Sequence, residues 1–145
     1  MHVQINEAIH SVLIAEDEMI VAMLMEDLVR ELGVRDVHIC PDVASALELL
    51  RTAHIDCAIL DMRLRDGDSA PIADALAEKG IPFLFSSGRE ACALQSRHAD
   101  RPMISKPFLD DDLKLILLDT WTLAQSARGS VDPARQRVAT SGATD

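Results

Sequence analysis

The stretch VLIAEDE, from Val12 to Glu18, places four apolar residues directly before three consecutive acids. A short apolar run that includes Val and Ile predicts a buried β-strand, here over residues 11–15. Acids at the end of a strand can begin the next helix, because carboxylates cap free amide groups and favour the positive end of the helix dipole. They can also form a binding site. The remaining sequence is needed to distinguish a helix cap from a binding site.

A short strand followed by an amphipathic helix recurs along the chain. Strands are predicted over residues 11–15, 36–40, 55–60, 81–86 and 101–105. Helices are predicted over residues 18–32, 43–53, 70–78 and 109–123, with a short, weakly patterned helix over residues 89–99. Asp42 is a predicted helix cap, and Gly33 and Gly80 are predicted helix stops. Strands that alternate with helices imply right-handed crossovers and a parallel sheet. The predicted fold is α/β, a five-stranded parallel sheet doubly wound by five helices, of which the fourth is short or irregular.

The length and the patterning indicate one compact domain. The chain of 145 residues suffices for a core that holds without disulfides or a structural metal. We expect the domain to span residues 11–125, after an N-terminal extension over residues 1–10. Residues 126–145 lack apolar periodicity and are expected to form a disordered tail.

Composition and charge exclude several classes of protein. The net charge of −10 argues against nucleic-acid binding, since such proteins concentrate positive charge. No apolar run is long enough to cross a membrane, and the N-terminus lacks the pattern of a secretion signal, so the cytoplasm is the expected location. Cys40, Cys57 and Cys92 lack CxxC spacing, which favours reduced thiols over disulfides or a zinc site. Cys57 is expected to be a buried small apolar residue.

Polar residues gather at the ends of the predicted strands. In a parallel α/β sheet, ligands bind at the carboxyl edge, where the loops of neighbouring strands converge. The residues at these ends are Glu16, Asp17, Asp61, Ser87 and Lys106. Crowded carboxylates repel one another unless a cation lies between them, and carboxylates with one carbonyl and several waters suit Mg²⁺. Asp61 is then a candidate nucleophile towards a phosphoryl group, whose oxygens Ser87 and Lys106 would contact.

Four segments, VLIAEDE, AILDMRLRDGD, IPFLFSSG and ISKPF, resemble the receiver domain of two-component response regulators in order and spacing. The resemblance covers residues 12–121 and implies a flavodoxin-like receiver fold with Mg²⁺ as the cofactor. It implies that Asp61 is the phospho-acceptor and that Glu16 and Asp17 are the acidic pair beside the metal. It also implies that Arg63 lends its backbone carbonyl to the metal.

The resemblance implies how the site is used. Ser87 matches the switch hydroxyl, and Lys106 matches the lysine that contacts the phosphoryl oxygens. The donor would be a histidine kinase or a histidine phosphotransfer protein. The receiver would phosphorylate and dephosphorylate itself with Mg²⁺ and is not expected to be an enzyme with a separate substrate. As a stand-alone receiver, it would signal by binding a downstream protein or by passing the phosphoryl group on.

Two positions depart from the family's commonest pattern, and one segment is similar to a signature found in part of the family. Glu16 stands where Asp is commoner. Met103 stands where an aromatic residue often moves inward on phosphorylation, so we expect a flexible thioether to repack there instead. The segment PFLFSSG, residues 82–88, is similar to the PFxFATG signature of a subgroup of single-domain regulators, some of them tied to the general stress response.

Apolar residues of two predicted helices raise the question of a partner surface. The run LKLILL, residues 113–118, carries more apolar surface than one core face needs. Core packing is one interpretation, and a homodimer through the fourth helix, fifth strand and fifth helix is the other. Met19, Met23 and Met25 have near-helical spacing and are expected to fill the core.

Functions from other classes fit these residues less well. A haloacid-dehalogenase-type phosphatase needs a second acid two residues after its nucleophile, where this chain has Arg63. A flavodoxin-like electron carrier needs hydroxyls and amides around the flavin phosphate, which the acids at residues 16–18 would repel. A nuclease site would use Glu16, Asp66 and Asp68, but RDGD is predicted to be a turn. A degenerate receiver that binds partners without phosphorylation is the main alternative.

Overall fold

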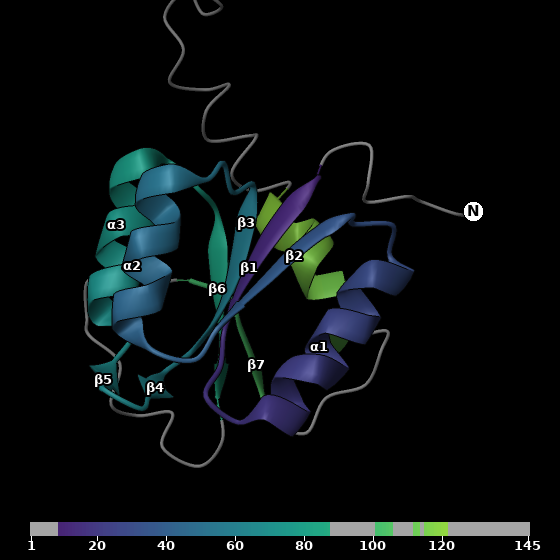
Figure 1. Cartoon of the computed structure of the whole chain (residues 1–145). Helices are drawn as coiled ribbons and strands as arrows, with labels where there is room; N and C mark the ends of the chain where they lie inside the picture. The colour runs from purple at the N-terminus through teal and green to yellow at the C-terminus, as the bar shows by residue number, and fades with distance from the viewer. Residues whose placement is uncertain (1–8, 88–100, 106–111, 114, 122–145) are drawn as a thin grey trace, which may run out of the picture.

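The computed structural model describes residues 9–87, 101–105, 112–113 and 115–121. Its centre is a five-stranded parallel sheet in the order β2-β1-β3-β6-β7 (Figure 1). The strands of this sheet are β1 (Ser11–Ala15), β2 (Asp36–Cys40), β3 (Cys57–Asp61), β6 (Phe83–Ser87) and β7 (Met103–Ser105). The helices are α1 (Met19–Glu31), α2 (Val43–Thr52) and α3 (Ala70–Lys79), and residues 112–113 and 115–121 are also helical. The predicted fold class is confirmed; the predicted helix over residues 89–99 lies outside the described residues.

The strand boundaries agree with the prediction to within two residues. Strands β1 and β2 begin and end as predicted, whereas β3, β6 and β7 each begin two residues later. For β6 the cause is local, because Pro82 has no N–H group to donate to the ladder. Its carbonyl still accepts a hydrogen bond from the Ala58 N–H at 3.2 Å. A proline at this position therefore delays the strand without breaking the sheet.

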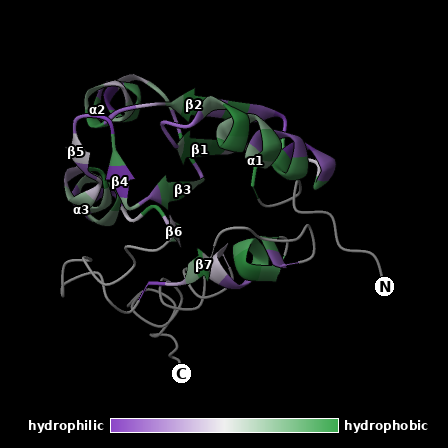
Figure 2. Ribbon diagram, turned by 90° about the horizontal axis from the view of Figure 1, so that it is seen from below, coloured by the Kyte–Doolittle hydropathy of each residue, from purple (hydrophilic) through white to green (hydrophobic). Residues whose placement is uncertain are grey.

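Helices cover both faces of the sheet. Figure 2 shows α2 and α3 on one side and α1 on the other. Side chains along a strand alternate between the two faces, so Leu60 and Phe85 pack towards α2 and α3, whereas Ile14 and Ile59 pack towards α1. Because both of their faces are buried, the central strands β1 and β3 are almost entirely apolar, whereas the edge strand β2 is largely partly exposed and carries Asp36 and His38.

The helix ends follow the predicted signals. Asp42 caps α2, since its Oδ1 accepts a hydrogen bond from the Ser45 N–H at 2.8 Å. Gly80 follows α3 in the left-handed conformation, with φ of 72°, which glycine adopts without a steric penalty. Among the helices of the described ranges, none is long and apolar enough to cross a bilayer.

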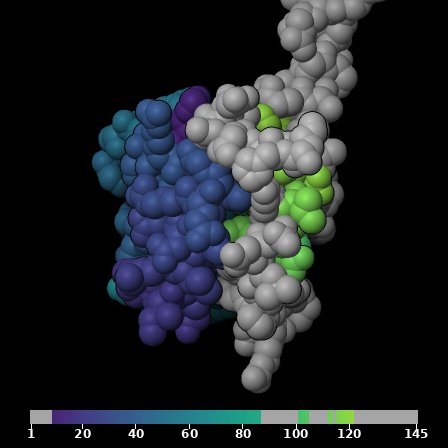
Figure 3. All heavy atoms as spheres, turned by 90° about the vertical axis from the view of Figure 1, so that its right-hand side faces the viewer, coloured from purple at the N-terminus to yellow at the C-terminus, as the bar shows by residue number. Residues whose placement is uncertain are grey.

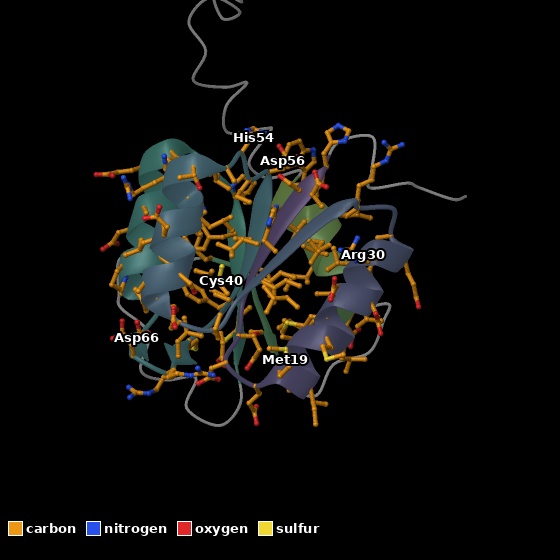
Figure 4. The ribbon with its side chains drawn as sticks, in the orientation of Figure 1. Met19, Arg30, Cys40, His54, Asp56 and Asp66 are labelled. Carbon is orange, nitrogen blue, oxygen red and sulfur yellow. The ribbon has the colours of Figure 1, made fainter. Side chains whose placement is uncertain are left out.

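The segment RDGD contains the predicted turn, at residues 65–66, and this turn connects the two strands of a hairpin. Strand β4 (Arg63–Leu64) pairs antiparallel with β5 (Gly67–Asp68). The carboxylate of Asp66 accepts hydrogen bonds from Val43 N–H at 2.7 Å and Ala44 N–H at 3.2 Å, at the start of α2 (Figure 4). Asp68 accepts one from Ala70 N–H at 3.0 Å, at the start of α3. Both acids therefore cap helices, which argues against a nuclease site that includes them.

The prediction that three methionines fill the core is correct for one and wrong for two. Met25 is fully buried, whereas Met19 and Met23 are each 54% exposed. Met25 lies on the same helical face as the buried Leu28 and Val29. At 100° per residue, positions 19 and 23 point to the opposite side of α1. The spacing correctly indicated that Met19 and Met23 share one face of α1, but that face is exposed to solvent.

The cysteines in the described part of the chain are free and buried. Burial raises the pKa of the Cys57 thiol to about 12, so this thiol stays protonated and behaves as a small apolar side chain, as predicted. Cys40 is also buried, and burial raises its pKa as well. Cys92 lies outside the described residues.

A hydrogen-bonded cluster joins the starts of β1 and β3, at the end of the molecule opposite to Met19 (Figure 4). Asp56 Oδ2 accepts hydrogen bonds from the N–H groups of His10 at 2.8 Å and Ser11 at 3.1 Å, and Oδ1 lies 2.7 Å from His54 Nε2. Partial burial raises the pKa of Asp56, but the hydrogen bonds from His10, His54 and Ser11 outweigh it. They hold the pKa below its ordinary value of 3.8.

We expect Asp56→Asn to lower the free energy of unfolding by about 1–2 kcal/mol at neutral pH, because it replaces a charged acceptor of several hydrogen bonds. A pKa that is lowered by folding contributes stability above the ordinary value, and this contribution is lost as the pH falls through the folded value. The difference between wild type and variant in urea unfolding should therefore begin to shrink below about pH 5 and continue to shrink as the pH falls below the ordinary pKa of 3.8. A difference that stays constant would contradict this account. Asp27→Asn, on the exposed surface of α1, is the control.

Candidate functional site

The acids of the opening stretch lie where β1 ends and α1 begins. The Glu16 N–H donates to the Cys40 carbonyl at 3.0 Å, so the ladder between β1 and β2 continues one residue beyond Ala15. This extended backbone carries the Glu16 side chain into the fold, where the residue is fully buried. Asp17 follows in the connection to α1 and is partly exposed. The sheet thus buries one acid and leaves the next at the surface.

The register of the sheet brings Asp61 to the same place. Ala15 on β1 is paired with Leu60 on β3, so the next residues of the two strands, Glu16 and Asp61, are side by side. Carboxylate oxygens of Glu16, Asp17 and Asp61 all lie within 4.8 Å of one another. In the part of the chain that the structure describes, this is the only such group of three potential metal ligands. The predicted convergence of the three acids is confirmed.

Helix capping does not account for this acidic cluster. Glu18 is the N-cap residue of α1, but its side chain makes no capping hydrogen bond, and the first turn of α1 contains no acid. The Glu18 N–H instead donates to Glu16 Oε2 at 3.1 Å. The Glu18 amide therefore pairs with one oxygen of the Glu16 carboxylate, and neither Asp17 nor Asp61 caps α1. The structure favours the binding-site interpretation.

The donor set of the cluster fits a small divalent cation. Its ligands are carboxylate oxygens without His or Cys, which suits a hard ion such as Mg²⁺ and not zinc. Mg²⁺ usually keeps several of its waters and is bound through a small number of carboxylates. The partial exposure of Asp17 and Asp61 leaves room for those waters and for a further oxygen ligand. Three negative charges this close also repel one another, so a cation would stabilise the folded state.

The structure describes the other predicted site residues to differing extents. Arg63 is exposed and begins β4, two residues after Asp61. Met103 begins β7, pairs with Phe85 and is partly buried against the core beneath α2 and α3. Ser87 is the last residue of β6, but its side chain and the whole of Lys106 lie outside the described residues. The roles of Ser87 and Lys106 therefore stay predictions.

The sequence places Ser86 with Ser87 at the end of the fourth predicted strand, but it assigned Ser86 no role in the site. Ser86 is fully buried in β6 and is the direct pairing partner of Asp61 on β3. In the sequence, Ser86 and Ser87 are two equivalent serines before a glycine. Only the register of β6 against β3 distinguishes them. From the sequence, only the alternation of side chains along the strand could have indicated which serine shares a face with Asp61. That inference requires the boundaries of β6 to be known.

Comparison with known proteins agrees with this geometry. The model of the response regulator receiver domain family matches residues 12–118. The solution structure of SdrG from Sphingomonas melonis Fr1 is 41% identical, with a TM-score of 0.70 over 77% of this chain and 95% of that chain. The BeF3-activated conformation of SdrG from Pseudomonas melonis Fr1 is 39% identical, with a TM-score of 0.68 over 79% of this chain and 98% of that chain.

A longer protein shares the same fold over part of its length. The PhyR stress response regulator is 30% identical, with a TM-score of 0.64, and the match covers 76% of this chain but 44% of that chain. Among curated proteins, no similar sequence is found. The similarity therefore extends over most of this chain and identifies the kind of domain that it forms.

Proposed function

Because the chain belongs to the response regulator receiver domain family, we propose that it accepts a phosphoryl group on Asp61 and signals to a protein partner. The observation that carries the proposal is the convergence of Glu16, Asp17 and Asp61 within 4.8 Å at the carboxyl edge of the sheet. An acceptor carboxylate needs a neighbouring cation, and two further acids beside it supply the ligands for one. The donor would be a phosphohistidine of a histidine kinase or a phosphotransfer protein.

The proposed reaction is a transfer between two protein side chains. An Oδ atom of Asp61 attacks the phosphorus, the P–N bond of the donor histidine breaks as the new P–O bond forms, and the leaving imidazole nitrogen takes up a proton. Glu16, Asp17, Asp61 and the Arg63 carbonyl would hold Mg²⁺, which when bound neutralises charge on the phosphoryl oxygens. Water later hydrolyses the acyl phosphate, so the domain would return to its free state without a separate substrate.

Two family residues would contact the phosphoryl group after transfer. We propose that the Ser87 hydroxyl donates a hydrogen bond to one phosphoryl oxygen and that Lys106 lies close to another. Drawing these residues inward would shift the segment after β6 between two arrangements, with Met103 repacking in place of an aromatic side chain. The resemblance of PFLFSSG to the PFxFATG signature, together with the similarity to a stress response regulator, supports a role in a stress pathway.

The first two turns of α1 offer a surface for the phosphoryl donor. Met19, Ile20, Met23 and Leu24 are all more than half exposed, with Ile20 at 84%. Figure 3 shows α1, coloured purple to dark blue, at the surface of the molecule. This apolar surface begins two residues after Asp17, at the same edge of the sheet as the acidic cluster. A protein that brings phosphohistidine to Asp61 has to approach over this edge, so its apolar residues would cover this part of α1.

We expect Ile20→Glu to slow transfer from a phosphorylated histidine protein by about tenfold or more, because a charge would replace a central apolar contact. Uptake from acetyl phosphate should be unchanged, since a small donor needs no docking surface. Leu115→Glu is the matched control, because Leu115 is also exposed, at 60%, but lies on the other proposed face. Equal effects of Ile20→Glu on the protein donor and on acetyl phosphate would contradict the docking role of α1.

The proposed homodimer remains a separate prediction about the helical residues 112–113 and 115–121. Of the apolar residues among these, Leu113 and Leu117 are buried and Ile116 and Leu118 pack against the core. Core packing therefore accounts for most of the run LKLILL, and Leu115 is the large apolar side chain that it leaves exposed. Size-exclusion chromatography of wild type and Leu115→Glu, with and without a phosphoryl mimic, measures whether this face forms a dimer.

Intact-mass spectrometry after incubation with acetyl phosphate tests the proposed function. With Mg²⁺ we expect the mass of one phosphoryl group to be added to each chain, and the addition should be absent with a chelator. Hydroxylamine should remove it, because it cleaves acyl phosphates and leaves phosphate esters intact. A protein that gains no mass in the presence of Mg²⁺ would instead fit a degenerate receiver that acts by binding alone.

A further inference from the structure

A buried hydroxyl next to the acidic cluster has no hydrogen-bond partner. Ser86 is fully buried, and among the residues that the structure describes no group lies within hydrogen-bonding distance of its Oγ. Buried polar groups in folded proteins are nearly always paired, because an unpaired group loses its hydrogen bonds to water without replacement. A buried serine without a partner therefore needs a physical explanation.

The pairing of the strands places Ser86 beside Asp61. Asp61 on β3 pairs with Ser86 on β6, and neighbouring parallel strands lie about 4.8 Å apart. Directly paired residues point to the same face of a sheet. Alternation confirms the face, since Leu84 packs in the same core cluster as Ile59, on the α1 side, two residues before Ser86 and Asp61 respectively. Ser86 and Asp61 thus share one face at the carboxyl edge.

The three strands form a row of polar side chains. Glu16 on the extension of β1 lies on one side of Asp61, and Ser86 on β6 lies on the other. The row ends at Ile104 on β7, which pairs with Ser86 and is buried. The acidic cluster therefore occupies one side of Asp61. Within the described strands, the residue on the other side of Asp61 is Ser86, an uncharged hydroxyl donor.

We propose that the Ser86 hydroxyl donates a hydrogen bond to the phosphoryl group on Asp61, in addition to the one expected from Ser87; this inference rests on the proposed function. A phosphoryl group brings strong acceptor oxygens to a hydroxyl that can rotate to meet them. Among the residues that the structure describes, this hydroxyl has no partner to give up in the unphosphorylated protein. The new hydrogen bond therefore stabilises the phosphorylated state alone and shifts the equilibrium towards it.

An ordered water is the competing explanation for Ser86. Buried waters often pair with polar groups that the protein leaves unsatisfied. A water that is hydrogen-bonded to Ser86 in the unphosphorylated and the phosphorylated protein would stabilise the two forms equally. The two explanations differ in what removal of the hydroxyl does to the free protein and to the phosphorylated one.

The experiment compares Ser86→Ala with wild type in Mg²⁺, with beryllofluoride as the mimic of the phosphoryl group. The midpoint of thermal unfolding is measured as beryllofluoride is added, which gives its half-saturating concentration. We expect the half-saturating concentration of beryllofluoride to be about tenfold higher for Ser86→Ala, because the variant loses one charge-assisted hydrogen bond. Without beryllofluoride, the midpoint of the variant should equal or exceed that of wild type. Ser11→Ala is the control, because Ser11 lies on β1 at the opposite edge and its hydroxyl donates to the His54 carbonyl at 2.7 Å.

Equal half-saturating concentrations for wild type and Ser86→Ala would overturn the inference. A lower unfolding midpoint of the free variant with unchanged beryllofluoride binding would overturn it too, in favour of a buried water. Failure of the proposed function has a different signature: wild type itself would then show no response to beryllofluoride, or Asp61→Asn would respond as strongly as wild type. These outcomes separate a wrong role for Ser86 from a wrong role for the whole site.

Discussion

Replacing Asp61 by asparagine is expected to abolish phosphoryl uptake from acetyl phosphate, down to the level of a sample without donor. The amide has nearly the shape of the carboxylate but lacks the negatively charged oxygen that attacks phosphorus. The fold should persist, because Asp61 is the last residue of β3 and is only partly buried. A phosphate-affinity gel measures the result, with wild type showing a retarded band in Mg²⁺ and the variant showing none.

The control for this variant is Asp66→Asn. Asp66 is also an acid near the carboxyl edge, but its carboxylate accepts hydrogen bonds from the first amides of α2. We expect this control to lose some stability and to retain full phosphoryl uptake. If Asp61→Asn and wild type were retarded equally on the gel, another residue would be the acceptor and the proposed function would be wrong.

Replacing Asp17 by asparagine should weaken Mg²⁺ binding by about tenfold or more. Changes to the outer partners of metal ligands already cost about 10–100-fold in affinity, so removal of a direct charged ligand should cost at least as much. Asp17 is the accessible acid beside the buried Glu16, and its carboxylate lies within 4.8 Å of the oxygens of both other acids. Isothermal titration calorimetry with MgCl₂ measures the affinity.

The same variant should change stability with opposite signs in the two conditions. In a chelator, Asp17→Asn should unfold at a higher temperature than wild type, because it removes one of three mutually repelling charges. In excess Mg²⁺ the order should reverse, since wild type gains more from binding the ion. Asp27→Asn, at an exposed position of α1, removes a charge without either effect. Unchanged Mg²⁺ affinity in Asp17→Asn would contradict the assignment of this acid as a ligand.

Much of the fold could be predicted because its signals are local. Short runs rich in strand-forming residues predicted β1 and β2 to the residue, and Asp42 and Gly80 marked helix ends through hydrogen bonds and backbone conformation within a few residues. The solvent face of α1 was harder to predict. A helix with apolar residues on more than one side has no single preferred face, so Met19 and Met23 could not be assigned to solvent from spacing alone.

The carboxyl edge could be predicted for a topological reason. Once the strands are parallel, their ends must meet, so Glu16, Asp17 and Asp61 were expected to converge and they do. Asp66 was not predicted to cap α2, because the partners Val43 and Ala44 lie 23 and 22 residues earlier in the chain. That contact exists only because the β4–β5 hairpin folds back over the start of the helix.

The sequence by itself determined which segments form the parallel sheet and which end of its strands carries the acids. It therefore also indicated the kind of site to expect, because these features depend on local periodicity and on the rule that parallel strands end at one edge. The tertiary structure alone decided which side chains are neighbours across strands. The register between β3 and β6 sets Ser86, rather than Ser87, directly beside Asp61. Register follows from how two helical layers pack against the sheet, and a shift by one residue would turn every side chain of the strand to the other face.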